Sequence, residues 1–324
     1  MPKAARPANL QEYKVWAQSA LGVDFNATNT KNHYETNVRT LQNTLQDSNF
    51  IKGFPAFLSK CEADYQRSAG CGLIMKPELK VVTKPFDSSI TKSYRINVLR
   101  NRRFPNPPDE GWVDANNWYS RFDDLVRSSL VCKFLDGPKF LAVALDDYAT
   151  SLGLSGTHVP RSTDDGYYAY HHYTAFPADI VGPNWDTHAV TSRLEVQLTT
   201  QLQEVLRELT HPLYEKARVS MDRKDDRWKW DFGTPRFRTS YLGHTLHMIE
   251  AVIVQVRDSF KSESEPEMEL SAGTLPPERT EQPVSSSAGL IEEIATAVVR
   301  GAQQTSTDNA TNAEGSSAET DLHG

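Results

Sequence analysis

The sequence contains few cysteines and no long apolar run. Its 324 residues include only three cysteines, which are too few for a disulfide framework and lack the spacing of a zinc site. The longest uninterrupted apolar run, residues 140–145, is far too short to cross a bilayer. No apolar segment typical of a secretory signal is visible near the start. We therefore expect a protein of the reducing cytoplasm that does not associate with a membrane.

Several common catalytic signatures are also missing. The chain has no Walker A phosphate loop, no Gly-x-Gly-x-x-Gly dinucleotide motif and no Gly-x-Ser-x-Gly nucleophile motif. No internal repeat is evident either. A function must therefore be sought in the spacing of individual polar residues.

Acidic residues are distributed unevenly along the chain. The formal net charge is −7, but residues 262–324 alone carry 12 acidic and two basic residues, which leaves residues 1–261 mildly basic. A mildly basic body suits a partner or substrate that carries phosphates. The acidic segment is also rich in Ser, Thr, Ala, Pro and Gly, so it buries too little apolar surface to offset the entropy of ordering. We predict a disordered acidic C-terminal tail over 262–324, with one short docking helix at 290–303.

The rest of the chain mixes helical and strand patterns. Apolar residues recur at helical spacing in some stretches and alternate with polar residues in others. We predict helices over residues 9–21, 32–47, 57–66, 87–99, 139–152, 200–220 and 241–260, and strands over residues 79–83, 123–134, 167–175 and 192–200. This pattern favours an α/β (α+β) fold with a central sheet covered by helices.

Lys84, Ser88 and Lys92 are spaced four residues apart where a predicted strand leads into a predicted helix. Ser88 and Lys92 lie one helical turn apart and share a face. A strand end, a helix N-terminus and two ammonium groups can together bind phosphate. The alternative is an ordinary solvent-facing helix surface.

Acidic residues stand on two of the predicted strands. Asp124 begins a buried strand and can hold Mg²⁺ that bridges phosphates, although an ordinary strand-edge aspartate gives the same pattern. Glu195 and Gln197 alternate with leucine and valine, so both polar groups share one face of their strand. A glutamate there can bind metal or accept a proton from a hydroxyl. A sheet surface open to water is the alternative.

Aromatic residues follow a predicted turn at Gly166. Tyr167, Tyr170 and His171 come directly after it, and aromatic side chains after a glycine turn can stack on a nucleic-acid base. The alternative is a strand rich in aromatic residues because they pack well there.

Two further patterns carry less weight. His244, His247 and Glu250 share one helical face and can bind metal, but no further ligand is suggested, so packing is the favoured interpretation. Residues 223–238 interleave six basic residues with aromatics, as in a nucleic-acid contact, but three aspartates dilute their charge.

The order and spacing of these motifs resemble the synthetase domain of the RelA/SpoT family. In chain order they are Lys84-x3-Ser88-x3-Lys92, Asp124-Leu-Val, Gly166-Tyr-x-Ala-x-His, Glu195-x-Gln-x-x-Thr and the run HPLYEK over residues 211–216. The resemblance implies N-terminal helices over residues 1–70 and a synthetase domain over residues 71–261. It implies a nucleotidyltransferase-like mixed sheet flanked by helices. It also implies an enzyme that transfers pyrophosphate from ATP to the 3′-hydroxyl of a nucleotide, usually GDP or GTP.

The resemblance further implies roles for individual residues. The residues that would bind ATP are Lys84, Ser88 and Lys92. The residues that would contact the acceptor are Tyr167, Tyr170 and His171. The residues that would carry catalysis are Glu195, Asp124 and Gln197. Of these, Asp124 and Glu195 would hold Mg²⁺ as the cofactor, and Glu195 would activate the attacking hydroxyl.

The chain departs from the family pattern where arginines are expected. Val82 stands two residues before Lys84, and Tyr168 and Thr199 stand at later arginine positions. From their positions, Arg127, Arg121 or Arg193 can compensate, and we assign Arg127 and Arg121 to ATP binding.

These departures are similar to those of the toxic small alarmone synthetases. Members of that group make adenosine alarmones or pyrophosphorylate the 3′-CCA end of tRNA, and many are paired with an antitoxin. The resemblance therefore implies ATP, a nucleotide or tRNA acceptor, an antitoxin and a homo-oligomer as partners. The alternative is a degenerate synthetase that binds nucleotide or RNA without catalysis. No His-Asp dipeptide occurs, so the hydrolase half of the long family members is not expected.

Overall fold

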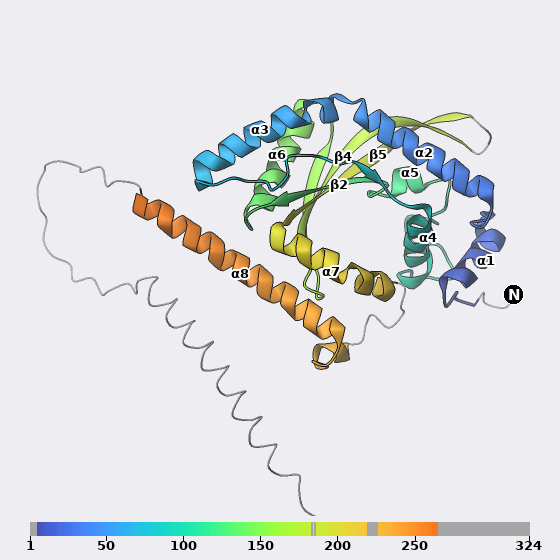
Figure 1. Cartoon of the computed structure of the whole chain (residues 1–324). Coiled ribbons are helices and arrows are strands. Elements are labelled where there is room, and N and C mark those ends of the chain that lie inside the picture. The colour runs from blue at the N-terminus through green and yellow to red at the C-terminus, as the bar shows by residue number, and fades with distance from the viewer. Residues whose placement is uncertain (1–4, 183, 185, 219–225, 265–324) are drawn as a thin grey trace, which may run out of the picture. The chain divides into compact units, whose positions relative to one another are not determined.

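The computed structural model describes residues 5–182, 184, 186–218 and 226–264 (Figure 1). The predicted acidic tail begins at residue 262, and nearly all of it, including the predicted helix at 290–303, lies outside the described residues. No helix among the described residues is long and apolar enough to cross a membrane.

A five-stranded mixed sheet forms the centre of the fold (Figure 1). Its strands are β1 (Val82–Thr83), β2 (Val126–Cys132), β3 (Gly156–Ser162), β4 (Tyr168–Val181) and β5 (Thr187–Thr200), in the spatial order β1-β2-β5-β4-β3. Strands β2 and β5 are parallel, and every other neighbouring pair is antiparallel. The expected α/β class and mixed sheet are confirmed.

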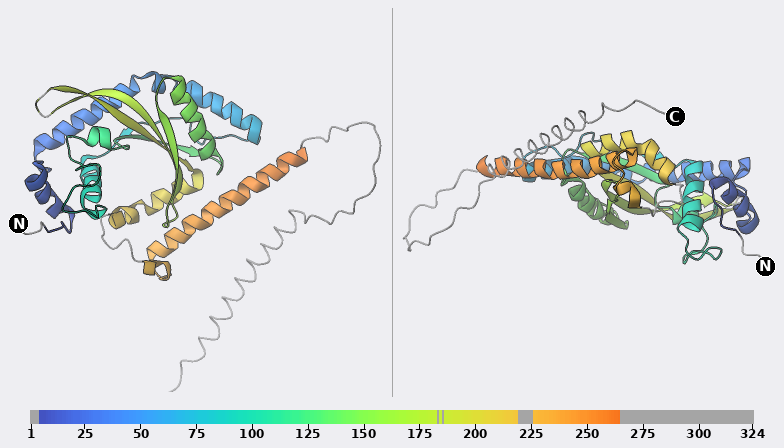
Figure 2. Two further views of the ribbon diagram at one scale, coloured as in Figure 1. Left: turned by 180° about the vertical axis from the view of Figure 1, so that it is seen from behind. Right: turned by 90° about the horizontal axis from the view of Figure 1, so that it is seen from below.

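Helices pack against this sheet. They are α1 (Leu10–Leu21), α2 (Thr28–Gln46), α3 (Asn49–Ala69), α4 (Phe86–Tyr94), α5 (Trp118–Arg121), α6 (Gly137–Ser151), α7 (Gln201–Arg218) and α8 (Pro235–Ser264), with a π-helical turn at Arg95–Leu99 after α4 and a short 3-10 helix at Asp226–Lys229. Helices α7 and α8 lie side by side in both views of Figure 2.

Helix α3 begins eight residues before the predicted position. Ser48 caps its N-terminus by accepting a hydrogen bond from the backbone N–H of Ile51. Pro55 lies inside the helix, where it lacks an N–H to donate. The predicted helix began two residues after this proline, whereas the cap starts the helix well ahead of it.

Alternation along the strands sorts the side chains onto two faces of the sheet. Leu194, Val196 and Leu198 are fully buried on one face, as predicted. Helices α2 and α6 pack on that face, and α3 packs against α2 and α6 (Figures 1 and 2). Buried residues of α1, α2 and α3 join the same core as those of the sheet. The opposite face therefore carries the polar members of β2, β4 and β5.

Candidate active site

Two lysines hold one aspartate where β1 and β2 meet. The Lys84 Nζ donates to Asp124 Oδ2 over 2.8 Å, and the Lys92 Nζ donates to Asp124 Oδ1 over 2.7 Å. Lys84 follows β1, Lys92 lies in α4 and Asp124 precedes β2. The structure thus brings Asp124 together with two lysines that lie 40 and 32 residues before it in the sequence.

Local hydrogen bonds fix this arrangement. The backbone N–H of Lys84 donates to the Leu125 carbonyl, which continues the β1–β2 ladder and sets Lys84 beside Asp124. The Tyr34 hydroxyl donates to the Lys84 carbonyl and lies 2.8 Å from the Ser89 hydroxyl, which ties α2 to the start of α4. Ser88 is half-buried one turn before Lys92.

The electrostatics of the cluster favour an anion. Burial alone would raise the pKa of Asp124, but the ammonium groups of Lys92 and Lys84 outweigh it and hold that pKa well below its usual range. Burial lowers the pKa of Lys84, against the attraction of Asp124. Two cations around one carboxylate leave a surplus positive charge beside the N-terminus of α4, where phosphate is stabilised.

A second cluster surrounds Glu195, which is only 5% exposed. Its Oε1 lies 2.7 Å from His171 Nδ1, and its Oε2 accepts from Gln197 Nε2 over 3.1 Å. The Tyr167 hydroxyl lies 2.8 Å from His171 Nε2. Tyr173 donates to Glu195 Oε1 over 3.4 Å.

This chain of hydrogen bonds has a direction. An ionised carboxylate can only accept, so His171 Nδ1 must carry the proton that it shares with Glu195. In a neutral imidazole the other nitrogen is then an acceptor, and the Tyr167 hydroxyl donates to it. Glu195 is consequently held in one orientation by groups from β4 and β5, with the imidazole tautomer set by both partners.

Arg127 lies between the two clusters. Its Cα is paired with that of Glu195 across β2 and β5, and with that of Val82 across β2 and β1. Its positive charge contributes to the lowered pKa of Lys84. No hydrogen bond or ion pair joins its side chain to residues 5–182, 186–210 or 226–264. The predicted ATP residue Arg127 is therefore available to an anion on the polar face of the sheet.

Two predicted residues lie apart from these clusters. Tyr170 points to the opposite face of β4 from His171, because neighbouring strand residues alternate, and its ring lies near His158. Arg121 in α5 donates to the Glu110 carbonyl over 2.6 Å and to its carboxylate over 2.9 Å. The structure thus does not gather these two residues with Glu195 or Lys84.

Tyr173 and Arg161 were missed by the sequence analysis. Tyr173 is the Cα partner of Glu195 across β4 and β5, and Arg161 Nη2 donates to the Tyr173 hydroxyl over 3.5 Å. Tyr173 shares a face with His171 two residues earlier, which strand alternation alone could have indicated. Arg161 lies on β3, a strand that the sequence did not predict.

The weaker sequence patterns take structural roles. The His247 ring stacks on Tyr168 with centroids 3.7 Å apart, and Tyr168 also hydrogen-bonds His244. Glu250 is buried on the same side of α8, and burial raises its pKa. No group of three or more His, Cys, Asp or Glu residues suited to a metal occurs in the described ranges. Packing, the favoured interpretation for this helical face, agrees with these contacts.

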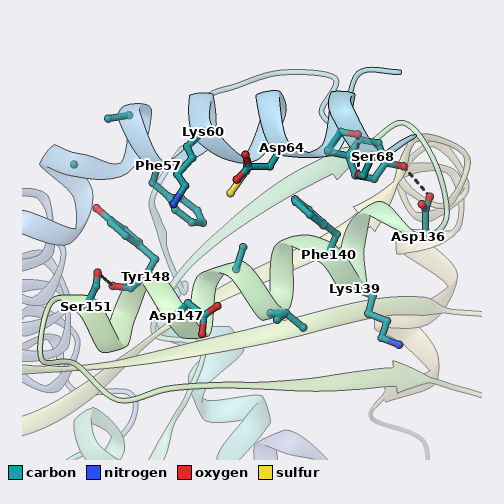
Figure 3. A pocket seen from close by; sticks show the side chains of 16 residues that line it. Phe57, Lys60, Asp64, Ser68, Asp136, Lys139, Phe140, Asp147, Tyr148 and Ser151 are labelled. Carbon is teal, nitrogen blue, oxygen red and sulfur yellow. Dashed lines mark hydrogen bonds between the residues drawn. The ribbon is translucent and has the colours of Figure 1, made fainter. Parts of the chain in front are cut away.

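A large groove lies elsewhere, between α3 and α6 (Figure 3). It has a volume of about 1010 Å³ and is lined by Phe57, Phe140 and Tyr148 together with Lys139. None of the predicted site residues lines it. Its size alone therefore does not make it the candidate site.

No protein-family model and no curated protein matches the sequence. Solved structures with a similar fold include small alarmone synthetase 1 from Bacillus subtilis, at 15% identity and a TM-score of 0.39, covering 66% of this chain and 94% of that one. Another is a GTP pyrophosphokinase family protein from Streptococcus pneumoniae, at 16% identity and a TM-score of 0.40, covering 68% and 95% of the two chains.

Proposed function

We propose that this protein is an ATP-dependent pyrophosphokinase that transfers pyrophosphate to the 3′-hydroxyl of a nucleotide acceptor. One observation carries the proposal. A surplus-positive lysine–aspartate cluster and an oriented, buried glutamate lie on neighbouring strands, with Arg127 between them. The lysine–aspartate cluster can bind a polyphosphate, and the glutamate can accept a proton. A pyrophosphokinase, which the order of the motifs resembles, uses both abilities.

The lysines exchange partners when ATP binds. A triphosphate offers more negative charge than one carboxylate, so the Lys84 and Lys92 ammonium groups move from Asp124 onto phosphate oxygens. Their release from Asp124 frees both carboxylate oxygens as ATP enters. In phosphoryl-type transfer the protein chiefly positions groups and neutralises charge, and the two lysines with Arg127 do both.

The acidic residues fit Mg²⁺ as the cofactor. Each Asp124 oxygen accepts one hydrogen bond and has capacity for another interaction. Mg²⁺ is typically held by one or two carboxylates plus substrate phosphates, so Asp124 and Glu195 suffice without a third acidic ligand. When bound, the ion supplies charge neutralisation on the phosphates.

Glu195 is the general base in this proposal. It takes the proton of the acceptor 3′-hydroxyl as that oxygen attacks the β-phosphorus of ATP. The new O–P bond forms while the bond between the β-phosphorus and the oxygen of the α-phosphate breaks, and AMP leaves. His171 and Gln197 orient the carboxylate, and the Tyr167 ring beside His171 contacts the acceptor base.

The acceptor is the finer part of the proposal. A guanine nucleotide, an adenosine nucleotide and the tRNA 3′ end all present a ribose hydroxyl that Glu195 could deprotonate, so the general base does not distinguish them. We propose an acceptor of the toxic-synthetase type, an adenosine nucleotide or tRNA, because Val82, Tyr168 and Thr199 stand at arginine positions. An antitoxin partner and a cytoplasmic location belong to the same proposal.

The test is AMP release from labelled ATP and Mg²⁺ by the purified full chain. Parallel reactions contain GDP, GTP, ADP, no acceptor or deacylated tRNA. Glu195→Gln serves as the blank, and Glu35→Gln, at an exposed position on α2, is the matched control. AMP with adenosine nucleotides or tRNA supports the full proposal, and AMP only with GDP or GTP supports the reaction but replaces the acceptor. ATP binding without AMP in any reaction would favour the degenerate binding module instead.

A further inference from the structure

Tyr167, which the proposed function places beside the acceptor base, belongs to the turn between β3 and β4. This turn, residues 163–167, is named the acceptor turn. The backbone N–H of Gly166 donates to the Thr163 carbonyl over 2.9 Å, and that of Thr163 donates to the Tyr167 carbonyl over 3.1 Å. The Tyr167 hydroxyl lies 2.8 Å from His171 Nε2. The position of the acceptor turn therefore decides where the Tyr167 ring lies.

Two ion pairs join the acceptor turn to α8 and to the short 3-10 helix before it. The Arg236 guanidinium donates to Asp165 Oδ1 through Nε over 3.1 Å and through Nη2 over 3.0 Å. The Lys229 Nζ donates to Asp164 Oδ2 over 3.1 Å. Arg236 also lies over the Trp228 ring, 4.2 Å from its centroid, which adds a cation–π contact. Because the Asp165 side chain is only 16% exposed, its pair with Arg236 is better shielded than an ordinary surface pair.

Tyr168, the residue directly after the turn, is a further contact with α8. Its ring stacks on His247 with centroids 3.7 Å apart, and its hydroxyl lies 2.8 Å from His244 Nδ1. His244 Nε2 lies 3.1 Å from the Asp164 carbonyl oxygen, which can only accept, so Nε2 carries the proton. In a neutral imidazole, Nδ1 then accepts from the Tyr168 hydroxyl. The position at which the family pattern has an arginine is thus occupied here by a residue that contacts α8.

The other end of α8 is attached independently of the acceptor turn. Arg257 pairs with Asp136 over 3.0 Å and donates to the Tyr65 hydroxyl over 2.8 Å. Its guanidinium also lies over the Phe134 ring, 5.1 Å from the centroid. These contacts join α8 to α3 and to the start of α6. Loss of one contact at the acceptor turn therefore leaves the helix attached to the protein.

We propose that α8 positions the acceptor-binding tyrosine: its contacts hold the acceptor turn so that Tyr167 stacks on the acceptor base, with Arg236 and Tyr168 as positioning residues. The proposal rests on the proposed function, because it takes Tyr167 as the contact to the base. A turn that is held before the acceptor arrives lowers the ordering cost of binding. The ATP residues Lys84 and Lys92 lie on other elements, beside β1 and in α4. Loosening the turn should therefore weaken acceptor binding and leave ATP binding unchanged.

The first test measures AMP release from labelled ATP by the full chain, with the KM for ATP and for ADP, GDP or deacylated tRNA determined separately. We expect Arg236→Gln and Asp165→Asn each to raise the acceptor KM by about tenfold, the usual effect of losing a charge-assisted hydrogen bond at a partly exposed site. The double variant should show no further rise, because both changes break one contact. The KM for ATP should not change.

The two variants separate positioning from simple charge. Arg236→Gln leaves the Asp165 carboxylate uncompensated, so it could repel an anionic acceptor, whereas Asp165→Asn breaks the same contact without baring a charge. A rise in acceptor KM confined to Arg236→Gln would therefore overturn positioning, as would an unchanged KM in both variants. Arg238→Gln is the matched control, because this exposed arginine on α8 bonds to the Phe232 carbonyl and should keep the wild-type KM.

The second test replaces Tyr168 with the arginine of the family pattern. Acceptor binding is measured by calorimetry with ADP, GDP and deacylated tRNA in separate titrations, each with a non-hydrolysable ATP analogue present. We expect Tyr168→Arg to bind the acceptor about tenfold more weakly, and Tyr168→Phe, which keeps the stack on His247, to lose less. Tighter binding by Tyr168→Arg would mean that this position contacts nucleotide, and would overturn the proposal.

Calorimetry also distinguishes failure of this proposal from failure of the proposed function. A wild type that releases no AMP with any acceptor would refute the reaction. Weaker nucleotide binding by Arg236→Gln than by Arg238→Gln would then still support the positioning role, and equal binding would overturn it. A wild type that binds none of the three acceptors would overturn both.

Discussion

Three side chains form hydrogen bonds with Glu195 within one small region of the sheet. Gln197 binds one of its oxygens, and His171 and Tyr173 approach the other. Because the carboxylate is buried and oriented, replacing it with an amide removes the base while preserving size. We expect Glu195→Gln to lower AMP release by roughly 10²–10⁴-fold, with the melting temperature nearly unchanged. The rate is measured under saturating ATP, and turnover equal to wild type would remove Glu195 from the mechanism.

Asp124 is a stability residue as well as a site residue. Asp124→Asn leaves two ammonium groups facing each other without their counter-charge. Removing one partner of a buried ion pair costs about 3–5 kcal/mol, and the partial exposure of this one reduces the figure to about 2 kcal/mol. We expect a lower melting temperature that inorganic pyrophosphate raises more in the variant than in wild type. An equal effect of pyrophosphate on both would show that the lysines do not bind phosphate.

Individual site residues were predictable to different degrees. Lys84, Asp124 and Glu195 could be chosen because each stands at a recognisable strand or strand end. Tyr170 was placed with His171 because both follow Gly166, although alternation on a strand sends adjacent residues to opposite faces. The position of Tyr173 beside Glu195 depends on the register between β4 and β5, which the sequence pattern of a single chain does not specify.

Among the elements, the long β4–β5 hairpin was predicted only in part. The predicted strands end at Ala175 and begin at Ser192, whereas β4 continues to Val181 and β5 starts at Thr187. Pro177 lies within β4, and a proline is a poor sequence signal for the interior of a strand. Strand β3 escaped prediction because its outward positions are mostly exposed and carry no regular apolar alternation. Its partner β4 supplies the hydrogen bonds that define it.

His172 on β4 makes the stability of the sheet depend on pH. It lies fully buried under α6, with Asp146 Oδ1 3.1 Å from its Nε2 and His158 bound to the other Asp146 oxygen. The two atoms at 3.1 Å lack hydrogen-bond alignment, and burial, the largest effect, lowers the pKa of His172 to about 4 despite that carboxylate.

This lowered pKa fixes the sign of the pH effect. Unfolding returns His172 to an ordinary pKa near 6.5, so between these values the unfolded chain binds a proton that the folded chain does not. We expect the free energy of unfolding to fall by up to about 3 kcal/mol as the pH is lowered from 7 to 4. His172→Gln should flatten this part of a urea-unfolding series, while His188→Gln, at an exposed position, should not. An identical slope in both variants would contradict the assignment.

Helix α8 contacts the turn that precedes β4, and this close approach depends on Gly166 in the turn and Gly243 in the helix. Gly166 has φ +78°, and a Cβ there would collide with the Ser240 carbonyl oxygen on α8. Gly166→Ala combines backbone strain with overpacking, so we expect a loss of about 2 kcal/mol or more. Hydrogen exchange along α8 should accelerate. Gly233→Ala, which meets no close neighbour, is the control, and equal exchange in both variants would refute the contact.

At the scale of the whole molecule, helices cover one face of the sheet and polar chemistry occupies the other. Helices α2 and α6 bury the apolar side of β4 and β5, and this division follows directly from the alternation visible in the sequence. The position of α8 could not be predicted in the same way. Ser240 and Glu250 on α8 are buried, whereas Leu242, Met248 and Ile253 are exposed, so the usual rule for deciding which side of a helix faces the core fails here.

The two edges of the sheet have a consequence for how copies of this protein can meet. Unpaired edge strands invite other chains to add a strand, which leads to aggregation. Here one edge is β1, only two residues long, and the other is β3, which contains Pro160 and therefore lacks one amide donor. Both edges are poor templates for strand addition. At high protein concentration, strand pairing between the sheet edges of two copies, which could lead to fibrils, is therefore disfavoured. Any ordered association would then use helical surfaces.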